Sequence, residues 1–376
     1  MTSLRIACIV HHDLEHGAGA AGSTLAMAER LRRMGHDVHT VGLELVGGGN
    51  SLWTQIRFPF AAARWVRRVL RENRYDVIEA STGDLYLLTA REIRRTKTVI
   101  VTRSHGLEPL AVAARRRARD RGELHLRRRF ALYHGAWRLI EVRRSLSLSD
   151  LVLVINESER EYVQSILGVS DEKIILTAPI VGAAYNGGVE RSTLTGGLLV
   201  LGGSQWRKGF DDHVTLVARL LDEYPSVAIT WLGVESVLEL GSLAEHSQRD
   251  RIKCLPSFLP EEAADFYSQH RVVLMRSRFE GLPMSLVEAM SHGLLVVTTD
   301  VPGPRDLVSE GRGFMNSLDD LSGAWTSLCT ALFSPEMQAM SWEAQRSSRR
   351  YAPDRVLHLL GANFLEATKA KTKPTR

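Results

Sequence analysis

The chain has 376 residues, of which 44% are hydrophobic and 24% charged, and its formal net charge is +5. This composition is typical of a globular protein rather than a disordered one, and the length predicts two domains. The three cysteines, Cys8, Cys254 and Cys329, are far apart, and none belongs to a C-x-x-C pair. That pattern excludes a disulfide framework and a cysteine zinc site, and it is typical of a reducing compartment.

The amino-terminal stretch "MTSLRIACIVHHD" has only a short apolar run before polar residues return. A signal peptide needs a longer apolar segment and a small-residue cleavage site, so we interpret this stretch as a first β-strand. No part of the sequence approaches the roughly 18 to 20 consecutive apolar residues that span a bilayer. We therefore expect a cytoplasmic protein.

Short apolar runs alternate with longer amphipathic segments along the first half of the chain. A helix is predicted after the first run and ends near Gly35. The runs are rich in Val and Ile and are predicted strands at residues 5–10, 37–43, 76–81, 98–104 and 151–156. Such alternation predicts a parallel sheet with helices on both faces, which is a doubly wound α/β domain.

The loop after the first strand, "HHDLEHGAGAAGST", contains Gly17, Gly19 and Gly22 ahead of a helix that we expect to begin near Ser23 or Thr24. Glycine lets a backbone approach a ligand closely, and a helix N-terminus favours anionic groups. The run matches the G-x-G-x-x-G fingerprint, but the loop is long and no acidic residue clearly ends the second strand. By itself it is weak evidence for a nicotinamide cofactor, and Gly17 and Gly19 are kept as candidate ligand contacts.

Between Arg115 and Arg144 there are eleven arginines against three acidic residues, Asp120, Glu123 and Glu141. One interpretation is a solvated helical hairpin. A second is a basic amphipathic face for an anionic membrane surface or an acidic substrate. A third is nucleic-acid binding, although no nucleic-acid motif accompanies the charge. Interspersed apolar residues keep the second interpretation open beside the first, namely Leu124, Leu126, Phe130, Leu132, Trp137 and Ile140.

Past Pro179 the pattern loosens into "AAYNGGVERSTLTGG", a predicted linker that joins the two halves near residues 186–197. The alternation then restarts, with predicted strands at residues 198–203, 228–233, 251–257, 272–277 and 295–300. We therefore expect two doubly wound α/β domains of similar size. Ligands of such sheets bind at the carboxyl ends of the strands, which makes the cleft between the domains the expected site.

One candidate site in the second half is a pair of adjacent cations. A predicted strand ends at Gly202 and Gly203, and the following loop carries Arg207 and Lys208 before Gly209 and a helix. Two cations at the carboxyl end of a strand are suited to neutralise a diphosphate. A pair that merely faces solvent on a loop is the alternative.

A second candidate is "FEGLPMSLVEAMSHG" at residues 279–293, which follows another predicted strand. The pattern predicts a helix start, with backbone N–H groups of Met284 to Leu286 placed for an anion. Glu280 is expected at the end of the strand. Glu288 is expected further down the helix, where a carboxylate among apolar residues needs a hydrogen-bonding partner. The alternative is an acid that complements the helix dipole together with a snorkelling glutamate.

From Leu199 to Gly313 the chain resembles the retaining family 4 glycosyltransferases of GT-B fold. The resemblance lies in "RKGFDD", in the spacing of Glu280 and Glu288, and in "AMSHG" and "VVTTDVPG". The first half agrees more loosely, through the glycine-rich loop, "RLRRMGHDVHTV" and "VTRSHGLEP". The resemblance implies two Rossmann-like domains, with residues 1–187 binding the acceptor and residues 196–350 binding a nucleotide-sugar donor. A helix at 355–370 is expected to pack back on the first domain.

Carried over residue by residue, the resemblance also implies roles. Glu280 would hold hydroxyls of the transferred sugar, and Glu288 would hold those of the nucleotide ribose. Lys208 would contact the diphosphate, and His105 in "SHG" would contact the donor sugar near the reacting carbon. Backbone contacts to sugar and phosphate would come from Gly281, Leu282, Met284, Ser285 and Leu286.

The chain departs from the family pattern at two positions. The family arginine is expected six residues before the lysine, where this chain has Gly202, and Arg207 is a candidate replacement from a neighbouring position. Pro283 stands where many relatives have glycine. The first departure bears on how the diphosphate is held.

The resemblance implies transfer of a sugar, with retention, from a UDP- or GDP-linked donor to a glycan, lipid-linked or small-molecule hydroxyl. No D-x-D pair is present, and no metal or other cofactor is expected beside the donor. Peripheral contact with the inner face of the cell membrane through residues 115–144 is an open expectation. Two alternatives are a retired transferase that only binds nucleotide sugars, favoured by the missing arginine, and a nucleotide-sugar epimerase.

Overall fold

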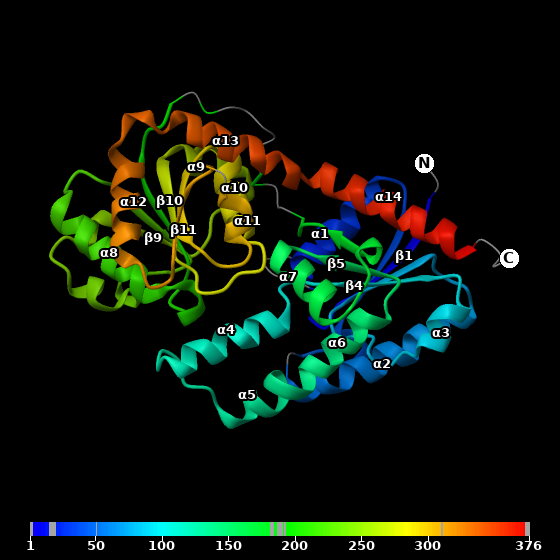
Figure 1. Cartoon of the computed structure of the whole chain (residues 1–376). Coiled ribbons are helices and arrows are strands. Elements are labelled where there is room, and N and C mark those ends of the chain that lie inside the picture. The colour runs from blue at the N-terminus through cyan, green and yellow to red at the C-terminus, as the bar shows by residue number, and fades with distance from the viewer. Residues whose placement is uncertain are drawn as a thin grey trace. The chain divides into compact units, whose positions relative to one another are not determined.

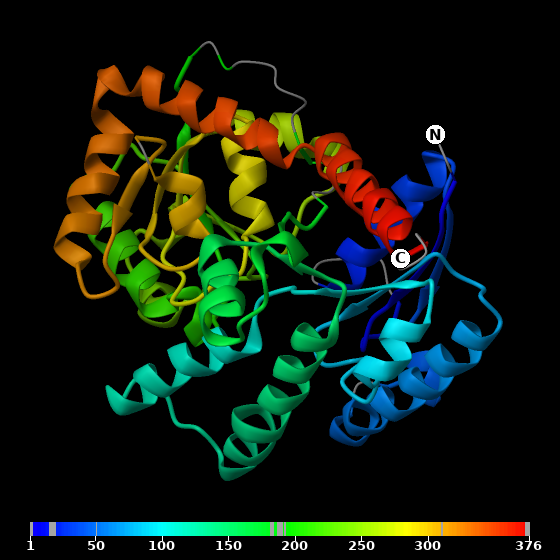
Figure 2. The same ribbon diagram turned by 45° about the vertical axis from the view of Figure 1, so that its right-hand side comes forward.

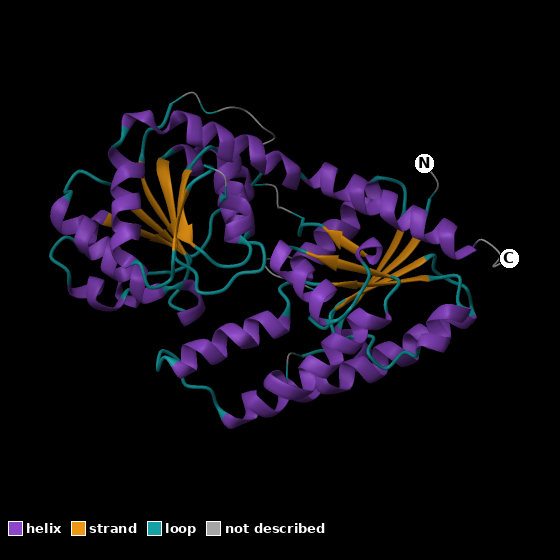
Figure 3. Cartoon of the chain, viewed as in Figure 1, coloured by secondary structure: helices purple, strands orange, loops and turns teal. Residues whose placement is uncertain are grey.

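The computed structural model describes residues 3–14, 20–49, 51–180, 184–185, 191, 193–309 and 311–372. The chain divides into two compact units, here called unit 1 (Met1–Ile180 with Pro353–Arg376) and unit 2 (Val181–Ala352). In each unit the described residues form one parallel six-stranded sheet covered by helices on both faces (Figure 3). The expectation of two doubly wound α/β domains is therefore confirmed.

The sheet of unit 1 has the strand order β2-β1-β3-β4-β5-β6. Its strands are β1 (Arg5–Ile9), β2 (Asp37–Val41), β3 (Val77–Ser81), β4 (Val99–Arg103), β5 (Leu151–Val154) and β6 (Ile174–Leu176). The sequence pattern predicted the first five and missed β6, which is only three residues long and therefore too short to show a periodicity.

Helices cover the two faces of this sheet (Figures 1 and 2). On one face lie α2 (Leu52–Arg71), α3 (Ala90–Arg95) and α6 (Arg138–Leu148), and on the other lie α1 (Ala20–Arg33) and α14 (Pro353–Thr372). The remaining helices are α4 (Glu108–Asp120), α5 (Arg128–Leu132) with the π-helical turn Tyr133–Trp137, and α7 (Glu157–Glu161). The carboxyl-terminal helix thus belongs to unit 1 although it follows unit 2 in the sequence.

The start of α1 differs from the sequence-based expectation. The helix includes Ala20 and therefore Gly22, whereas we expected it to begin near Ser23 or Thr24. Alanine is the strongest helix former, so the helix extends over this stretch. The Thr24 hydroxyl donates to the Ala20 carbonyl at 2.9 Å from within the helix and does not cap its start. Gly17 and Gly19 lie outside the described residues.

The sheet of unit 2 has the order β12-β11-β10-β7-β8-β9. Its strands are β7 (Gly197–Leu201), β8 (Ile229–Leu232), β9 (Ile252–Leu255), β10 (His270–Met275), β11 (Leu295–Thr299) and β12 (Phe314–Asn316). Its helices are α8 (Phe210–Glu223), α9 (Ala263–Ser268), α10 (Met284–Ser291), α11 (Pro304–Val308), α12 (Leu321–Phe333) and α13 (Gln338–Ser348). The sequence pattern missed β12, again a strand of three residues.

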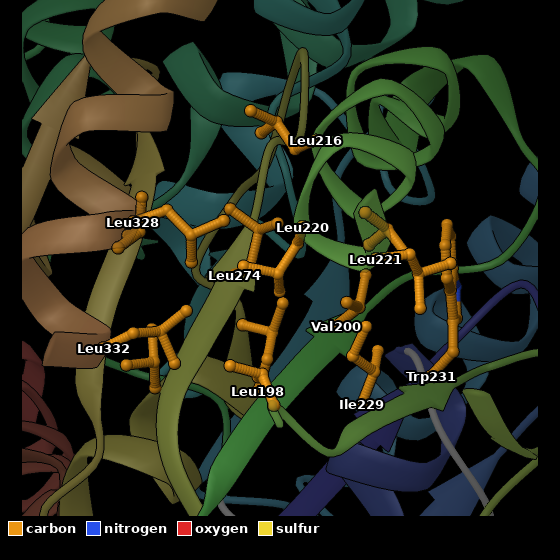
Figure 4. Close-up of a cluster of buried hydrophobic side chains, with 14 of the residues drawn as sticks. Leu198, Val200, Leu216, Leu220, Leu221, Ile229, Trp231, Leu274, Leu328 and Leu332 are labelled. Carbon is orange, nitrogen blue, oxygen red and sulfur yellow. The ribbon is translucent and has the colours of Figure 1, made fainter. Parts of the chain in front are cut away.

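One face of this sheet packs against α8 and α12 through a core of leucines and valines (Figure 4). Leu198 and Leu274 of the sheet and Leu220 of α8 are completely buried there. Trp231 is also completely buried, and its indole N–H donates to the carbonyl of Gly202 at 2.7 Å. The core thereby fixes the backbone at the carboxyl end of β7, where the predicted cation loop begins.

Each strand order has one switch point, where neighbouring strands lead to helices on opposite faces of the sheet. In unit 1 it lies between β1 and β3, and in unit 2 between β7 and β10. Open α/β sheets bind ligands at the carboxyl ends of such strand pairs. Among the described residues, no helix combines the length and the apolar character that crossing a membrane requires.

Candidate functional site

At the switch point of unit 2, the carboxylate of Glu280 lies between two cations. Lys208 Nζ is 2.8 Å from its Oε1 atom, and Arg207 Nη1 is 2.9 Å from its Oε2 atom. The Ser277 hydroxyl donates to Oε1 at 2.9 Å. Glu280 is only 6% exposed, whereas the Lys208 and Arg207 side chains are 25% and 36% exposed. The structure thus brings together three residues that the sequence predicted as site residues. The two cations lie on the solvent side of the buried carboxylate.

The positions of these cations follow from the connection between two loops. Arg207 and Lys208 belong to the 3₁₀ turn Trp206–Lys208 between β7 and α8. The amide of Arg278, in the loop after β10, donates to the Arg207 carbonyl at 2.8 Å. Asp212 in the first turn of α8 pairs with both Arg276 and Arg278, at 3.3 and 3.2 Å. The loop that carries the cations is therefore tied to the loop that carries Glu280.

Gly202, where the family pattern has arginine, has a backbone that disfavours any side chain. Its φ is +139°, and a Cβ atom built there would lie 3.0 Å from Cβ of Lys208. The stem of Lys208 therefore occupies the space where an arginine side chain would begin. Arg207 reaches the same carboxylate from the adjacent turn, so two cations are present without an arginine at position 202.

The helix after Glu280 begins at Met284, where the sequence predicted a helix start. Met284 and Ser285 lie in its first turn, where backbone N–H groups point out of the helix. The amide of Leu286 donates to the Pro283 carbonyl at 3.1 Å, so its N–H group is used within the turn. An anion at this helix end would therefore meet the amides of Met284 and Ser285 rather than that of Leu286.

The turn before this helix, Gly281–Pro283, is held by a close approach of Gly303, which precedes α11. Gly303 has a φ of +86°, and a Cβ atom there would lie 2.0 Å from the Gly281 carbonyl oxygen. Leu282 in the same turn is buried. Gly303, in the "VPG" part of the family motif, thus packs its backbone directly against the turn that follows Glu280.

Glu288 lies on α10 and is half-buried. Its Oε2 atom accepts a hydrogen bond of 3.3 Å from the Tyr267 hydroxyl. Burial raises the pKa of Glu288 to about 7, and the Tyr267 hydrogen bond opposes that rise. Tyr267 comes from α9 and stacks on His292 with ring centroids 4.6 Å apart. The sequence did not identify Tyr267, because no local signal links it to a glutamate 21 residues away.

His105 follows β4 at the carboxyl edge of the unit 1 sheet. Burial lowers its pKa to about 3, helped by the nearby charges of Arg103, His11 and His12. The imidazole is therefore neutral at physiological pH and can act only through hydrogen bonds. This is the position that the family pattern indicated for contact with the donor sugar.

A second polar pair at this edge escaped the sequence analysis. His11 follows β1 and Asp84 follows β3, and His11 Nδ1 lies 2.8 Å from Asp84 Oδ1 at the switch point of unit 1. Asp84 is completely buried, and its Oδ2 atom has no hydrogen-bond partner among the described residues. A buried carboxylate so placed orients the ring of His11, because an ionised carboxylate only accepts and Nδ1–H is then the donor. The two residues are 73 positions apart, so only the strand order brings them together.

Metal-binding clusters were also sought. In the described part of the chain, no three or more His, Cys, Asp and Glu side chains are grouped so that they could hold a metal ion.

Comparison with known protein families gives two matches that together cover most of the chain. Residues 17–181 match the model described as "Glycosyltransferase Family 4", and residues 196–334 match "Glycosyl transferases group 1". The glycogen synthase of Streptococcus sanguinis (strain SK36) is 26% identical over 154 residues, which are 40% of this chain and 29% of that protein. The match therefore spans less than a third of the length of this curated relative.

Solved structures are similar over nearly the whole chain. Sucrose-phosphate synthase from Thermosynechococcus elongatus aligns with a TM-score of 0.75 at 14% identity, covering 97% of this chain and 100% of that one. A glycosyltransferase from Rickettsia africae ESF-5 aligns with a TM-score of 0.69 at 13% identity and covers all of both chains. At this identity the likeness establishes the fold, which is GT-B.

Proposed function

The chain belongs to the group 1, family 4 glycosyltransferases, and on this premise we propose that it transfers a hexose from a nucleoside diphosphate sugar to an acceptor hydroxyl with retention. The observation that carries the proposal is the Lys208–Glu280–Arg207 arrangement at the switch point of unit 2. It combines cations for a diphosphate with a carboxylate for sugar hydroxyls, beside the N-terminus of α10.

On the donor side, Lys208 and Arg207 neutralise the charge that develops on the departing diphosphate. The first-turn amides of Met284 and Ser285 add hydrogen bonds to the phosphate oxygens. Glu280 accepts hydrogen bonds from hydroxyls of the sugar, with Gly281 and Leu282 close to it through their backbone. The two cations, rather than a metal ion, carry the stabilisation in this scheme.

Glu288 accepts hydrogen bonds from the ribose hydroxyls of the nucleotide. Its half-buried position and its pKa of about 7 support this role, because burial makes an ionised carboxylate costly unless donors satisfy it. Tyr267 supplies one donor, at 3.3 Å, and the ribose would supply further ones. UDP or GDP is the proposed leaving group.

The acceptor hydroxyl is assigned to unit 1, where His11, held by Asp84, presents Nε2 as a hydrogen-bond partner. His105, as a neutral imidazole, contacts the donor sugar. During transfer the bond between C1 of the sugar and the phosphate oxygen breaks, and a bond from C1 to the acceptor oxygen forms on the same face. The acceptor proton passes to the departing phosphate oxygen. Glycans, lipid-linked sugars and small molecules are candidate acceptors.

The test is a thermal-shift screen with UDP, GDP, ADP and their hexose conjugates, followed by product analysis with the stabilising donor. A ligand at a hundred times its Kd adds about 2.7 kcal/mol to the free energy of unfolding. Lys208→Ala should abolish the shift, whereas Lys253→Ala, an exposed lysine on β9, should retain it. Binding without turnover would support a retired transferase, interconversion of the donor sugar would support an epimerase, and no binding would refute the proposal.

A cytoplasmic location remains a prediction, as does an acceptor at a membrane. Both follow from the sequence and neither is needed for the chemistry of the donor site.

A further inference from the structure

Unit 1 exposes an unusual share of large apolar side chains on a few helices. Six of the thirteen exposed large hydrophobic residues found in the described chain lie on α2 or between Leu132 and Ile140. Trp53 and Leu132 are the most open of them, 74% and 75% exposed. The full set is Leu52, Trp53, Phe60, Leu132, Trp137 and Ile140. We call this set, together with the exposed arginines Arg57, Arg64, Arg68, Arg143 and Arg144, the outer face of unit 1.

On α2, the exposed side chains form one stripe in which aromatic and arginine residues mix. The stripe repeats every three or four positions, which is the spacing of one helical face. It consists of Trp53, Arg57, Phe60, Arg64 and Arg68. The opposite side of the helix, with Phe58, Ala62 and Val66, is completely buried against the sheet. The stripe therefore points away from unit 1.

A second stripe runs from the end of α5 through the π-helical turn into α6, over residues 132–144. Leu132, Trp137 and Ile140 are exposed and are followed by Arg143 and Arg144, which are also exposed. Val142 and Leu146, on the other side of α6, are completely buried.

The two stripes belong to one side of unit 1. Helices α2 and α6 cover the same face of the sheet (Figures 1 and 2), and Leu148 of α6 packs against the core that α2 buries. A hollow of about 330 Å³ is lined by Leu52 at the start of α2 and by Phe130 and Tyr133, which lie close to Leu132 in the sequence. The outer face therefore draws on both helices on one side of unit 1.

This part of unit 1 is also strongly cationic. Residues 52–71 contain five arginines and no acidic residue, and residues 108–148 contain eleven arginines and four acidic residues. Together they carry +12, although the whole chain carries +5, so the remainder of the chain is net negative at −7. The positive charge is concentrated on the side of unit 1 that exposes tryptophan, leucine and isoleucine.

The structure also separates arginines that the sequence could not tell apart. Arg138 is buried and pairs with Glu108 and Glu141, both at 3.1 Å, so it stabilises unit 1 from within. On α4 and just after it, Arg119 pairs with Asp120 and Arg121 with Glu123, each at 2.6 Å. The outer face therefore differs from the predicted 115–144 segment, because it omits these residues and includes α2.

We propose that the outer face of unit 1 docks in the plane of a bilayer that contains anionic phospholipids. Tryptophan rings settle at the boundary between headgroups and acyl chains, and leucine and isoleucine reach the acyl region. Arginines in the same stripes contact the lipid phosphates. A nucleic acid would use the arginines but would leave Leu132 and Ile140 exposed to water. The proposal rests on unit 1 alone, so its failure would not affect the donor site of unit 2.

The test is co-sedimentation of the full chain with vesicles of phosphatidylcholine alone or mixed with phosphatidylglycerol. We expect binding to the mixed vesicles only, weakened by added salt. Each arginine near such a surface contributes about 1 kcal/mol, so Arg57→Ala with Arg64→Ala should lower the partition coefficient about 30-fold. Trp53→Ser with Trp137→Ser should lower binding and remove the blue shift of tryptophan emission that insertion causes.

Two matched controls lie in unit 1 but off the outer face. Ile166→Ser removes another exposed apolar residue, which is 60% exposed, and Arg33→Ala removes an exposed arginine from α1 on the opposite face of the sheet. Both should bind vesicles like the parent chain, and thermal unfolding verifies that all variants fold. The proposal is overturned if the outer-face variants bind as the controls do, if neutral vesicles bind equally, or if short DNA duplexes displace the chain from mixed vesicles.

Discussion

Lys208 Nζ lies 2.8 Å from Glu280 Oε1, and Arg207 holds the other oxygen of the same carboxylate at 2.9 Å. One buried carboxylate therefore positions both cations that we assign to the diphosphate. Such sharing gives Glu280 two separable tasks, because its negative charge anchors the cations and its oxygens accept from sugar hydroxyls. Substitutions can distinguish the two tasks.

Glu280→Gln should separate donor binding from transfer. The amide keeps the shape but removes the charge, so the cations gain net attraction for a diphosphate while the sugar loses its ionised acceptor. Hydrogen bonds to charged groups contribute about 1.5–3 kcal/mol, which corresponds to a loss of transfer of about 10- to 150-fold. We expect nucleoside diphosphate affinity, measured by calorimetry, to be unchanged or higher.

The control for this variant is Glu262→Gln, an exposed acid in the 3₁₀ turn before α9. It should leave both binding and transfer unchanged. If Glu280→Gln kept full transfer activity, Glu280 would be only an anchor for the cations and its proposed contact with the sugar would be wrong.

Donor affinity should depend on pH through Glu288, whose pKa is raised to about 7 by burial. Below that pH the carboxyl is protonated and offers fewer acceptors to ribose hydroxyls, so affinity should rise between about pH 6 and pH 8. Tyr267→Phe removes a hydrogen bond that lowers this pKa, and should therefore move the transition to higher pH. Calorimetric titrations of the nucleoside diphosphate across this range are the measurement.

Glu288→Gln should give an affinity that is lower at neutral pH and flat across the range. The same group contributes to stability with the opposite sign of slope. Because its folded-state pKa lies above the ordinary 4.5, its contribution is full below about pH 4.5 and is lost as the pH rises through about 7. A pH dependence of affinity that survived in Glu288→Gln would assign it to another residue.

Part of the proposed donor site could be predicted from the sequence because its signals are local. Strand, turn and helix follow one another between β10 and α10, so Glu280 and the helix start at Met284 were predictable. Lys208 was predictable for the same reason. The contacts of these residues were not, since a sequence pattern does not state which side chain meets which carboxylate.

Other features depend on strand order, which the sequence does not display. His11 and Asp84 meet because β1 pairs with β3, and Tyr267 meets Glu288 because α9 and α10 flank the same strand. Short strands such as β6 and β12 gave no periodic signal. The exposed stripe on α2 was not predicted, because its arginines are fewer than those between Arg115 and Arg144, although Trp53, Arg57 and Phe60 share a helical spacing.

The His11–Asp84 pair should affect the acceptor and not the donor. Asp84→Asn keeps the volume in a completely buried position but removes the charge that holds the His11 ring. We expect the acceptor KM to rise or kcat to fall, by about 10- to 100-fold in kcat/KM together, as for loss of an orienting partner. Nucleoside diphosphate affinity should stay unchanged.

Steady-state kinetics with varied acceptor and fixed donor measure this effect. Asp76→Asn is the control, because Asp76 is another hydrogen-bonded acid of unit 1 but lies beside Arg5 at the start of the sheet. Equal losses in both variants would indicate a general effect on folding, and the acceptor role of the pair would be abandoned.

Restoring the family arginine at position 202 should harm the protein. The backbone there has a φ of +139°, and a Cβ atom would press on Lys208 Cβ at 3.0 Å. Such strain costs about 1–3 kcal/mol. Gly202→Arg should therefore lower the melting temperature and, by moving Lys208, weaken nucleoside diphosphate binding.

The control is Ser204→Arg, which adds the same charge two residues later at an exposed position. It should change neither the melting temperature nor nucleoside diphosphate binding. Tighter binding in Gly202→Arg would show that the loop adapts and that Arg207 does not replace the family residue.

The close approach of Gly303 to the Gly281 turn can be tested against another glycine of positive φ that has open surroundings. Gly303 and Gly311 have φ values of +86° and +76°, so alanine is strained at both positions. Only at position 303 would the new Cβ lie 2.0 Å from the Gly281 carbonyl oxygen, whereas nothing lies within 4 Å at position 311. Overpacking adds about 1–3 kcal/mol, so Gly303→Ala should unfold at a clearly lower temperature than Gly311→Ala.

The same pair of variants tests the proposed contact between this turn and the donor. Because the turn carries Gly281 and Leu282 beside Glu280, only Gly303→Ala should also weaken donor binding. Equal donor affinity in the two variants would mean that the turn does not contact the donor, whatever the difference in melting temperature.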